Sequence, residues 1–238
     1  MEAEHDWEIT SERYVTYIDI MGFKDMVARL PHKDVYELLK KIDGKKKIVA
    51  RVEWVKDHDG LVKITTYSDS IILYSKDDSF ESFDCLVSTT AGLMNYLFIE
   101  GVPFKGAVAF GLMTLDTERS IFFGQPLIDA YLLQEEIYFY GVLFHSSVEY
   151  KLQAIHAKWP PFTSAYPCNL KTGPAKHMTI YPLYARAKEG EKFNDNYLAL
   201  MKAVKDLRLK TSGQLRKYID NTEQYLTGVN ESHKFNYD

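Results

Sequence analysis

The chain has few cysteines, no long apolar run and no concentration of basic residues. Its two cysteines, Cys85 and Cys168, lie far apart and lack the spacing of a metal site, so we expect free thiols and no disulfide. No apolar stretch approaches the roughly 20 residues that a membrane-spanning helix needs. The first residues are acidic, where a secretory signal would be basic. These absences predict a cytoplasmic protein with no membrane partner.

Charge and motif content narrow the class of protein further. With 29 Lys and Arg against 33 Asp and Glu, the net charge is −4, and no segment gathers enough positive charge to follow a nucleic-acid backbone. The sequence lacks both Gly-x-x-x-x-Gly-Lys-Ser/Thr and Gly-x-Gly-x-x-Gly, the loops of common ATPases and dinucleotide enzymes. The histidines fall in different predicted elements, without the spacing of zinc ligands. We therefore expect no nucleic-acid partner and no zinc site.

Hydrophobic periodicity predicts an ordered series of strands and helices. Residues 13–20 are rich in β-branched and aromatic types and predict a buried strand that ends near Asp19. Two short helices follow, separated by Pro31. Residues 61–67 and 70–75 predict a hairpin with Asp69 at its tip. The later predictions are helices at 79–99, 124–136, 194–207 and 212–226, strands at 104–110 and 140–148, and a hairpin segment at 111–123.

This order predicts an α+β fold, a ferredoxin-like palm in which helices cover one side of an antiparallel sheet. We assign residues 10–150 to this domain. Residues 151–238 form a C-terminal loop and helical extension, in which the proline-containing segments 158–161 and 167–174 resemble a covering loop. The tail after Gly228 is expected to fray.

Two aspartates stand at the ends of apolar strands, where an unpaired charge would be costly. They lie in Tyr-Ile-Asp-Ile-Met-Gly-Phe at residues 17–23 and in Thr-Tyr-Ser-Asp-Ser at residues 66–70. In a palm fold the first strand and the hairpin are neighbours, so Asp19 and Asp69 can converge. Together with the carbonyl of Ile20 they offer the oxygen ligands that Mg²⁺ or Mn²⁺ prefers. Either aspartate alone could instead cap a turn or a helix.

The turn after Asp19 offers a second ingredient of a phosphate site. Met21, Gly22 and Phe23 stand at the start of a predicted helix, where main-chain amides can face an anion. We expect these residues to contact a triphosphate.

Four motifs resemble one enzyme family. The segment around Asp19 is similar to the class III nucleotidyl cyclase signature Asp-Ile-x-Gly-Phe, and Ser68-Asp69 resembles the family's Gly-Asp hairpin tip. The segments Tyr-Ile-Asp-Ile-Met-Gly-Phe-Lys, Tyr-Ser-Asp-Ser-Ile, Lys-Gly-Ala-Val-Ala-Phe-Gly and Phe-Phe-Gly-Gln-Pro-Leu-Ile-Asp-Ala-Tyr together resemble the bacterial pyrimidine cyclases of Pycsar antiphage systems. The resemblance spans about residues 12–150.

The resemblance implies an activity and a set of partners. Asp19, Asp69 and the carbonyl of Ile20 would hold two divalent ions, Mn²⁺ or Mg²⁺. The enzyme would convert UTP, or alternatively CTP, to the 3′,5′-cyclic monophosphate and pyrophosphate, as a second messenger of antiphage defence. Class III cyclases build their sites between two subunits, so the resemblance also implies a homodimer.

One departure from the purine enzymes concerns the base. In those enzymes the position four before the second metal-binding Asp carries Lys or Glu, whereas this chain has Thr65. A short hydroxyl could bond a pyrimidine edge, and Tyr17 or Tyr67 could narrow the cleft against a purine; packing on the sheet is the alternative role for these side chains. Lys105 is a candidate triphosphate contact or, alternatively, a surface lysine.

A second departure concerns the helix after Gly124. Purine cyclases carry on it an Asn and an Arg that act on the ribose and the transition state, and the aligned residues here are Ile128 and Leu132. Asp129, Tyr131 and Gln134 on the same helix are candidates to orient the substrate or the dimer. Two other functions therefore stay open: an adenylate or guanylate cyclase, and a non-catalytic nucleotide-binding sensor that keeps the cyclase fold.

Overall fold

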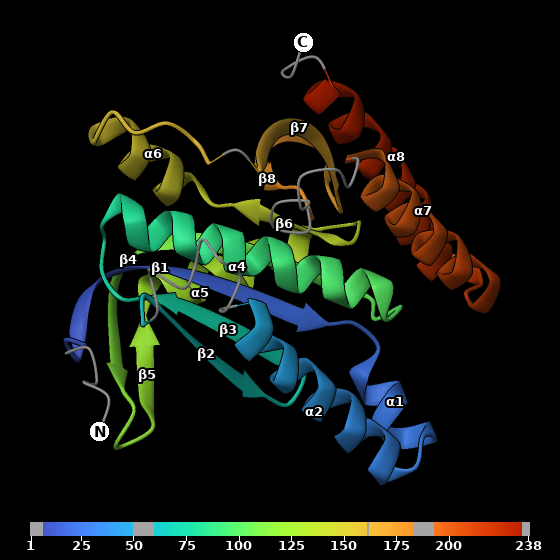
Figure 1. Cartoon of the computed structure of the whole chain (residues 1–238), viewed down its shortest axis with the longest axis horizontal. Helices are drawn as coiled ribbons and strands as arrows, with labels where there is room; N and C mark the ends of the chain where they lie inside the picture. Colours follow the sequence, from blue (N-terminus) through green and yellow to red (C-terminus); the bar gives the residue numbers. More distant parts are fainter. Residues whose placement is uncertain (1–6, 50–59, 161, 183–192, 235–238) are drawn as a thin grey trace.

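The computed structural model describes residues 7–49, 60–160, 162–182 and 193–234 (Figure 1). The strands are β1 (Thr10–Ile20), β2 (Val62–Tyr67), β3 (Ser70–Ser75), β4 (Phe104–Asp116), β5 (Ile121–Gly124), β6 (Gly141–Phe144), β7 (Thr163–Leu170) and β8 (Gly173–Ile180). The helices are α1 (Phe23–Arg29), α2 (His32–Val49), α4 (Phe80–Ile99), α5 (Gln125–Glu136), α6 (Ser146–Ala154), α7 (Phe193–Lys210) and α8 (Arg216–Lys234), with a short 3₁₀ turn at Gly213–Leu215.

A single mixed sheet organises the molecule. Its strand order is β2-β3-β1-β4-β6-β8-β7, and β5 pairs with β4 outside this path. The β1–β3, β1–β4 and β2–β3 pairs are antiparallel, whereas β4 and β6 are parallel. The predicted α+β class is confirmed, as is the hairpin that carries Asp69 at its tip. The long β1 strand lies between β3 and β4, so its last residues meet the hairpin on one side and β4 on the other.

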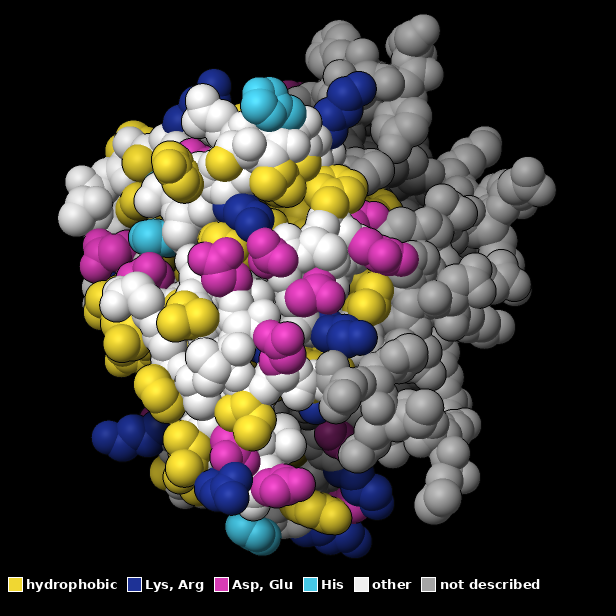
Figure 2. All heavy atoms as spheres, turned by 90° about the vertical axis from the view of Figure 1, so that its left-hand side faces the viewer, with side chains coloured by type: hydrophobic (Ala, Val, Ile, Leu, Met, Phe, Trp, Pro, Cys, Tyr) yellow, Lys and Arg dark blue, Asp and Glu magenta, His cyan; other side chains and the backbone are white. Residues whose placement is uncertain are grey.

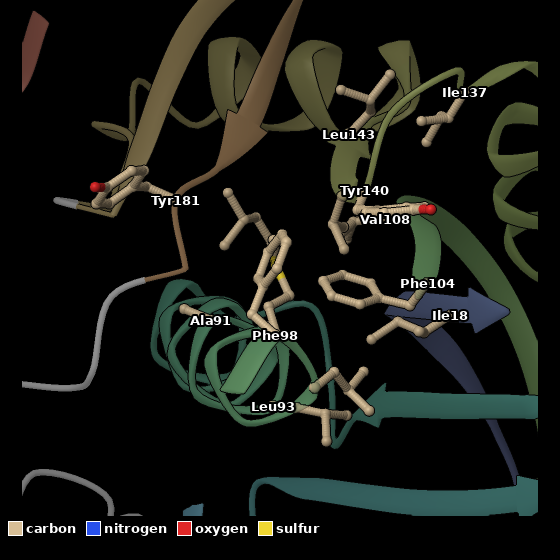
Figure 3. Close-up of a cluster of buried hydrophobic side chains, with 14 of the residues drawn as sticks. Ile18, Ala91, Leu93, Phe98, Phe104, Val108, Ile137, Tyr140, Leu143 and Tyr181 are labelled. Atoms are coloured by element: carbon tan, nitrogen blue, oxygen red, sulfur yellow. The ribbon is translucent and has the colours of Figure 1, made fainter. Parts of the chain in front are cut away.

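The main core lies between the sheet and α4. Alternate residues of β1 point toward this helix, because side chains on a strand have a period of two; Ile18 belongs to the cluster, and Thr16 is bonded to Thr90 of α4 at 3.2 Å between the hydroxyl oxygens. Figure 3 shows Phe98 of α4 facing Phe104 of β4, with ring centroids 5.0 Å apart. These contacts fix one face of β1 in the core and turn Tyr17 and Asp19 to the other.

Helix α5 covers the opposite face of the sheet, so the expectation that helices lie on one side only is wrong. Ala130 of α5 packs on Ala107 and Ala109 of β4, with Tyr17 and Leu133 around them. Three alanines at this contact let the helix lie close to the strands. In Figure 1, α5 lies behind the sheet while α4 lies in front of it. The residues Tyr17 and Asp19 therefore share a face with α5.

The C-terminal part contains a hairpin where a covering loop was expected. Strands β7 and β8 pair from Thr163–Ile180 to Leu170–Gly173, and β8 joins the sheet through β6. The predicted loop at residues 167–174 is therefore wrong. Of the other predicted loop segment, 158–161, residues 158–160 are irregular and residue 161 lies outside the described residues. The predicted strand at 140–148 ends at Phe144, and α6 begins two residues later.

Two long helices complete the extension, as predicted. Helix α7 contacts α4 through a hydrogen bond of 2.7 Å, which the Asn95 side-chain amide donates to Asn196 Oδ1. Helix α8 packs on β7. Helix α8 runs on to Lys234, beyond the position where the tail was expected to fray. Both cysteines are buried, and neither takes part in a disulfide. Among the helices of the described ranges, none is long and apolar enough to cross a membrane.

Candidate active site

Strand pairing brings Asp19 and Asp69 to the same end of the sheet. Asp19 lies directly opposite Ser70, the residue that follows Asp69. The amide of Ile20 donates to the carbonyl oxygen of Asp69 at 2.8 Å, which ties the end of β1 to the hairpin tip. Directly paired residues lie about 5 Å apart, so two aspartates that are distant in the sequence become neighbours.

The backbone at the hairpin tip has a conformation that favours glycine. Ser68 has a φ of 55°, in the left-handed region that favours glycine. Ser68 stands where the signature that this segment resembles has Gly, and its φ is one that Gly adopts without strain.

The carboxyl of Asp19 is electrostatically unusual. Burial raises its pKa from 3.8 to about 6; the charge of Lys105 opposes this rise, and the charges of Asp69 and Glu135 add to it. A carboxylate that is partly desolvated beside a second negative charge is stabilised by a bound cation. The pair thus has the electrostatics of a cation site.

We expect Asp19 to destabilise the metal-free fold near neutral pH. Because its folded-state pKa of about 6 lies above the ordinary 3.8, the protonated carboxyl favours folding at acid pH, and this contribution is lost as the pH rises from about 4 to 6. Asp19→Asn should therefore stabilise the protein at pH 7.5 by on the order of 1–2 kcal/mol more than at pH 4.5, a value reduced for partial exposure. Urea unfolding in EDTA measures the free energy of unfolding of the wild type and of Asp19→Asn at each pH. An equal change in this free energy at the two pH values would contradict the raised pKa of Asp19.

Lys105 stands on the other side of Asp19 and is not a surface lysine. The two residues pair across β1 and β4. The Lys105 side chain is only 7% exposed, and its ammonium donates to Glu135 Oε1 of α5 at 2.9 Å. Glu135 was not singled out from the sequence, because nothing in its local pattern connects it with a lysine 30 positions away. Only the packing of α5 on the sheet brings the two together.

One main-chain amide of the turn at residues 21–23 already donates a hydrogen bond within the fold. The amide of Met21 donates to Pro103 O at 2.9 Å, so this amide does not contribute to a phosphate cradle. Gly22 has a φ of 75° and precedes α1, and Phe23 is the first residue of that helix. First-turn amides have no partner within their own helix. The predicted cradle is thus reduced to Gly22 and Phe23.

The three candidates for base recognition lie on β2 and β1, which are separated by β3. Thr65 pairs with Ile72, which in turn pairs with Tyr17. The Tyr17 hydroxyl is 2.5 Å from Ser70 Oγ, and its ring meets the ring of Tyr131 edge-on at 5.5 Å. Tyr67, two residues after Thr65, is 80% exposed. Packing accounts for the position of Tyr17, whereas Tyr67 projects from the sheet.

Helix α5 presents apolar side chains where purine cyclases have polar ones. Ile128 and Leu132 are 52% and 56% exposed. Asp129 accepts a bond from Gln125 at 2.7 Å and lies 3.8 Å from the ring of His145. Gln134 is fully buried and points its amide nitrogen at Glu135. Gln134 therefore reaches the neighbourhood of Asp19 through Glu135, and Tyr131 reaches it through its ring contact with Tyr17.

The donor set at this end of the sheet fits a hard divalent ion. Within the described residues no group of three or more His, Cys, Asp or Glu could hold a metal, so a closed structural site of the zinc type is not formed there. Two carboxylates and a main-chain carbonyl suit Mg²⁺ or Mn²⁺, since such ions keep water and substrate phosphates as further ligands. The fit rests on Asp19, Asp69 and Ile20.

Comparison with known proteins identifies the fold. No protein-family model and no curated protein sequence matches the chain. The structure is similar to the adenylyl cyclase CyaB from P. aeruginosa, with a TM-score of 0.50 and 12% identity over 74% of this chain and 96% of that one. It is also similar to the catalytic core of a rhodopsin-guanylyl cyclase with converted specificity in complex with ATPalphaS, with a TM-score of 0.52 and 16% identity over 72% and 95% of the two chains. The chain has the fold of class III nucleotidyl cyclases.

Proposed function

We propose that this protein is a pyrimidine nucleotide cyclase that converts UTP, with CTP as second candidate, to the 3′,5′-cyclic monophosphate and pyrophosphate. The observation that carries the proposal is the convergence of Asp19 and Asp69 at the end of β1 in a fold of class III cyclases. The sequence resemblance to Pycsar enzymes supports the pyrimidine substrate and a role of the product as a second messenger in antiphage defence.

The ribose O3′ forms a bond to the α-phosphorus, and the bond between the α-phosphorus and the oxygen that bridges it to the β-phosphorus breaks. The proton of the 3′-hydroxyl passes to solvent. Two divalent ions, when bound, would lower the pKa of that hydroxyl and neutralise charge on the leaving pyrophosphate. Asp19, Asp69 and the carbonyl of Ile20 would hold them. The amides of Gly22 and Phe23 would orient the phosphates at the start of α1.

Three side chains on one face of the sheet would read the base. The distance between adjacent strands is about 4.8 Å, and Ile72 of β3 lies between Thr65 and Tyr17 on this face. The base would therefore lie over Ile72, with Thr65 and Tyr17 at its two edges. Thr65 offers a hydroxyl that can donate or accept, which suits a pyrimidine edge. Tyr67 would close the exposed side. The same positions would leave less room for a purine.

Homodimer formation is part of the proposal. The outer face of α5 and the β4–β5 hairpin exposes large apolar side chains, and hydrophobic side chains line the left margin of Figure 2, the side on which α5 lies. Several large apolar side chains exposed on one face are typical of a protein interface. Its members, each about half exposed or more, are Leu112, Ile121, Phe123, Ile128, Tyr131 and Leu132. A second copy bound to this face would lie next to the Asp19–Asp69 pair of the first copy and complete its active site.

The proposed catalytic residues all lie within residues 10–150, and residues 151–238 would support that domain. In the alternative of a non-catalytic sensor, the apolar Ile128 and Leu132 would mark the loss of turnover. In the alternative of an adenylate or guanylate cyclase, Thr65 would read a purine.

Incubation of the purified protein with ATP, GTP, CTP and UTP, each with Mn²⁺, tests the substrate. We expect UTP to give the fastest formation of a cyclic monophosphate by liquid chromatography, at least about tenfold above either purine, as expected for one hydrogen-bonding contact of about 1.4 kcal/mol. A purine preference would support the adenylate or guanylate alternative. Binding of a nucleotide without release of pyrophosphate would support the sensor.

A further inference from the structure

The Lys105–Glu135 ion pair lies against the proposed metal site. Lys105 is directly opposite Asp19 in the β1–β4 register, and both residues belong to the face of the sheet that α5 covers. The Lys105 side chain is 7% exposed. A buried ammonium must be paired, because its desolvation is otherwise too costly. Which anion pairs with Lys105 therefore affects Asp19, the carboxylate beside it.

Glu135 is held in place from its own helix and from the extension. Its Oε1 accepts bonds of 2.9 Å from both Lys105 Nζ and the amide nitrogen of the fully buried Gln134. Its Oε2 lies 3.7 Å from Lys171 Nζ, at the turn between β7 and β8. The bond from Lys105 is the largest cause that holds the pKa of Glu135 below its usual value. Glu135 is thus an oriented, ionised partner for Lys105.

We propose that Glu135 is a positioning residue that draws the Lys105 ammonium toward α5 and so leaves the oxygens of Asp19 available to a divalent cation. Asp19 is the cross-strand neighbour of Lys105, and the charges of the two residues interact, so without the Glu135 carboxylate this buried ammonium would turn toward Asp19. A direct Lys105–Asp19 pair would occupy the oxygens that the cation needs. The inference rests on the proposed cation site at Asp19 and Asp69.

This role differs from simple charge balance near the site. If Glu135 only contributed a negative charge, its removal and the removal of Lys105 would act independently on the affinity for a cation. If Glu135 instead controls where the ammonium goes, the two effects depend on one another. Such dependence appears as non-additivity in a double-mutant cycle.

The test is a Mn²⁺ titration of the nucleotide-free protein, with free Mn²⁺ measured by electron paramagnetic resonance. The variants are Glu135→Gln, which keeps the size of the side chain, Lys105→Met, and the double variant. We expect Glu135→Gln to weaken binding about tenfold or more, as loss of an outer partner of a metal ligand does. Lys105→Met on its own should change the Mn²⁺ affinity less than about threefold. In the double variant it should restore the affinity that Glu135→Gln loses, which is the coupling expected of contacting residues. Additive effects would overturn the proposal.

Two controls separate this inference from its foundation. Glu136→Gln removes the same charge from the next residue of α5 and should leave Mn²⁺ affinity nearly unchanged; an equal loss there would mean that Glu135 acts by charge alone. Asp69→Asn should abolish binding. If wild-type protein shows no Asp69-dependent binding of Mn²⁺, the proposed metal site and this inference both fail, whereas intact binding that ignores Glu135→Gln overturns the inference alone. Thermal unfolding of each metal-free variant checks that the fold is retained.

Discussion

Replacing Asp69 with Asn will lower the rate of cyclic nucleotide formation by about a thousandfold. The proposed reaction places negative charge on the leaving pyrophosphate, and stabilisation of developing charge is usually the largest catalytic contribution, with single groups accounting for about 10²–10³ in rate. The substitution keeps the size of the side chain. It also keeps the main-chain carbonyl of Asp69, which accepts the Ile20 amide at 2.8 Å, so the hairpin tip should hold its geometry.

The measurement is product formation at saturating UTP and Mn²⁺, followed by chromatography of quenched samples. Asp25→Asn is the matched control, because Asp25 is an exposed carboxylate of α1 that pairs with Arg29 at 3.8 Å. Surface pairs of this kind contribute little, so Asp25→Asn should keep its rate within about twofold. Near-normal activity in Asp69→Asn would remove the basis for a metal-dependent reaction at this site.

If the protein forms the proposed homodimer, a charge introduced on the outer face of α5 should separate the two copies and abolish the proposed cyclase activity. Leu132 is 56% exposed on this face. If a second copy covers it, Leu132→Glu buries an unpaired carboxylate and removes an apolar contact, and central contacts of this kind commonly contribute 2 kcal/mol or more. We expect the dimer dissociation constant to rise at least about thirtyfold, with activity lost in parallel at low protein concentration.

Sedimentation velocity across a concentration series measures the association. Leu198→Glu provides the control, since Leu198 of α7 is 58% exposed but belongs to the extension; the dimer should tolerate it. A wild-type protein that is monomeric and fully active at all concentrations would contradict the arrangement in which the site is shared between two subunits.

Local patterns were sufficient to predict the elements around the site. The period-two alternation on either side of Ser68-Asp69 predicted β2 and β3, and the regular apolar spacing of residues 79–99 predicted α4. The prolines of residues 167–174 misled the interpretation of the next segment. Pro167 lies in β7, at the edge of the sheet, and Pro174 precedes the part of β8 that pairs with β6. Proline is tolerated where a ladder hydrogen bond is not required.

The candidate site was predictable only in part, for a comparable reason. Asp19 and Asp69 could be found because each ends an apolar strand, a placement that is visible in the sequence. The Lys105–Glu135 pair could not be found in this way, because it depends on how closely α5 packs on alanines of β4. The apolar character of Ile128 was visible, but its exposure followed only from the orientation of the helix. Contacts between elements thus required the three-dimensional structure.

The most direct test of the central claim is the identity and stoichiometry of the products. Wild-type protein and the Asp19→Asn/Asp69→Asn double variant are incubated with UTP and Mn²⁺, the metal is removed on a chelating resin, and the products are measured by phosphorus NMR. We predict a 3′,5′-cyclic phosphodiester and pyrophosphate in equal amounts from the wild type and neither from the double variant. Phosphate or pyrophosphate without a cyclic ester, or equal product from both proteins, would contradict the assignment of Asp19 and Asp69 as the metal-binding pair of a nucleotide cyclase.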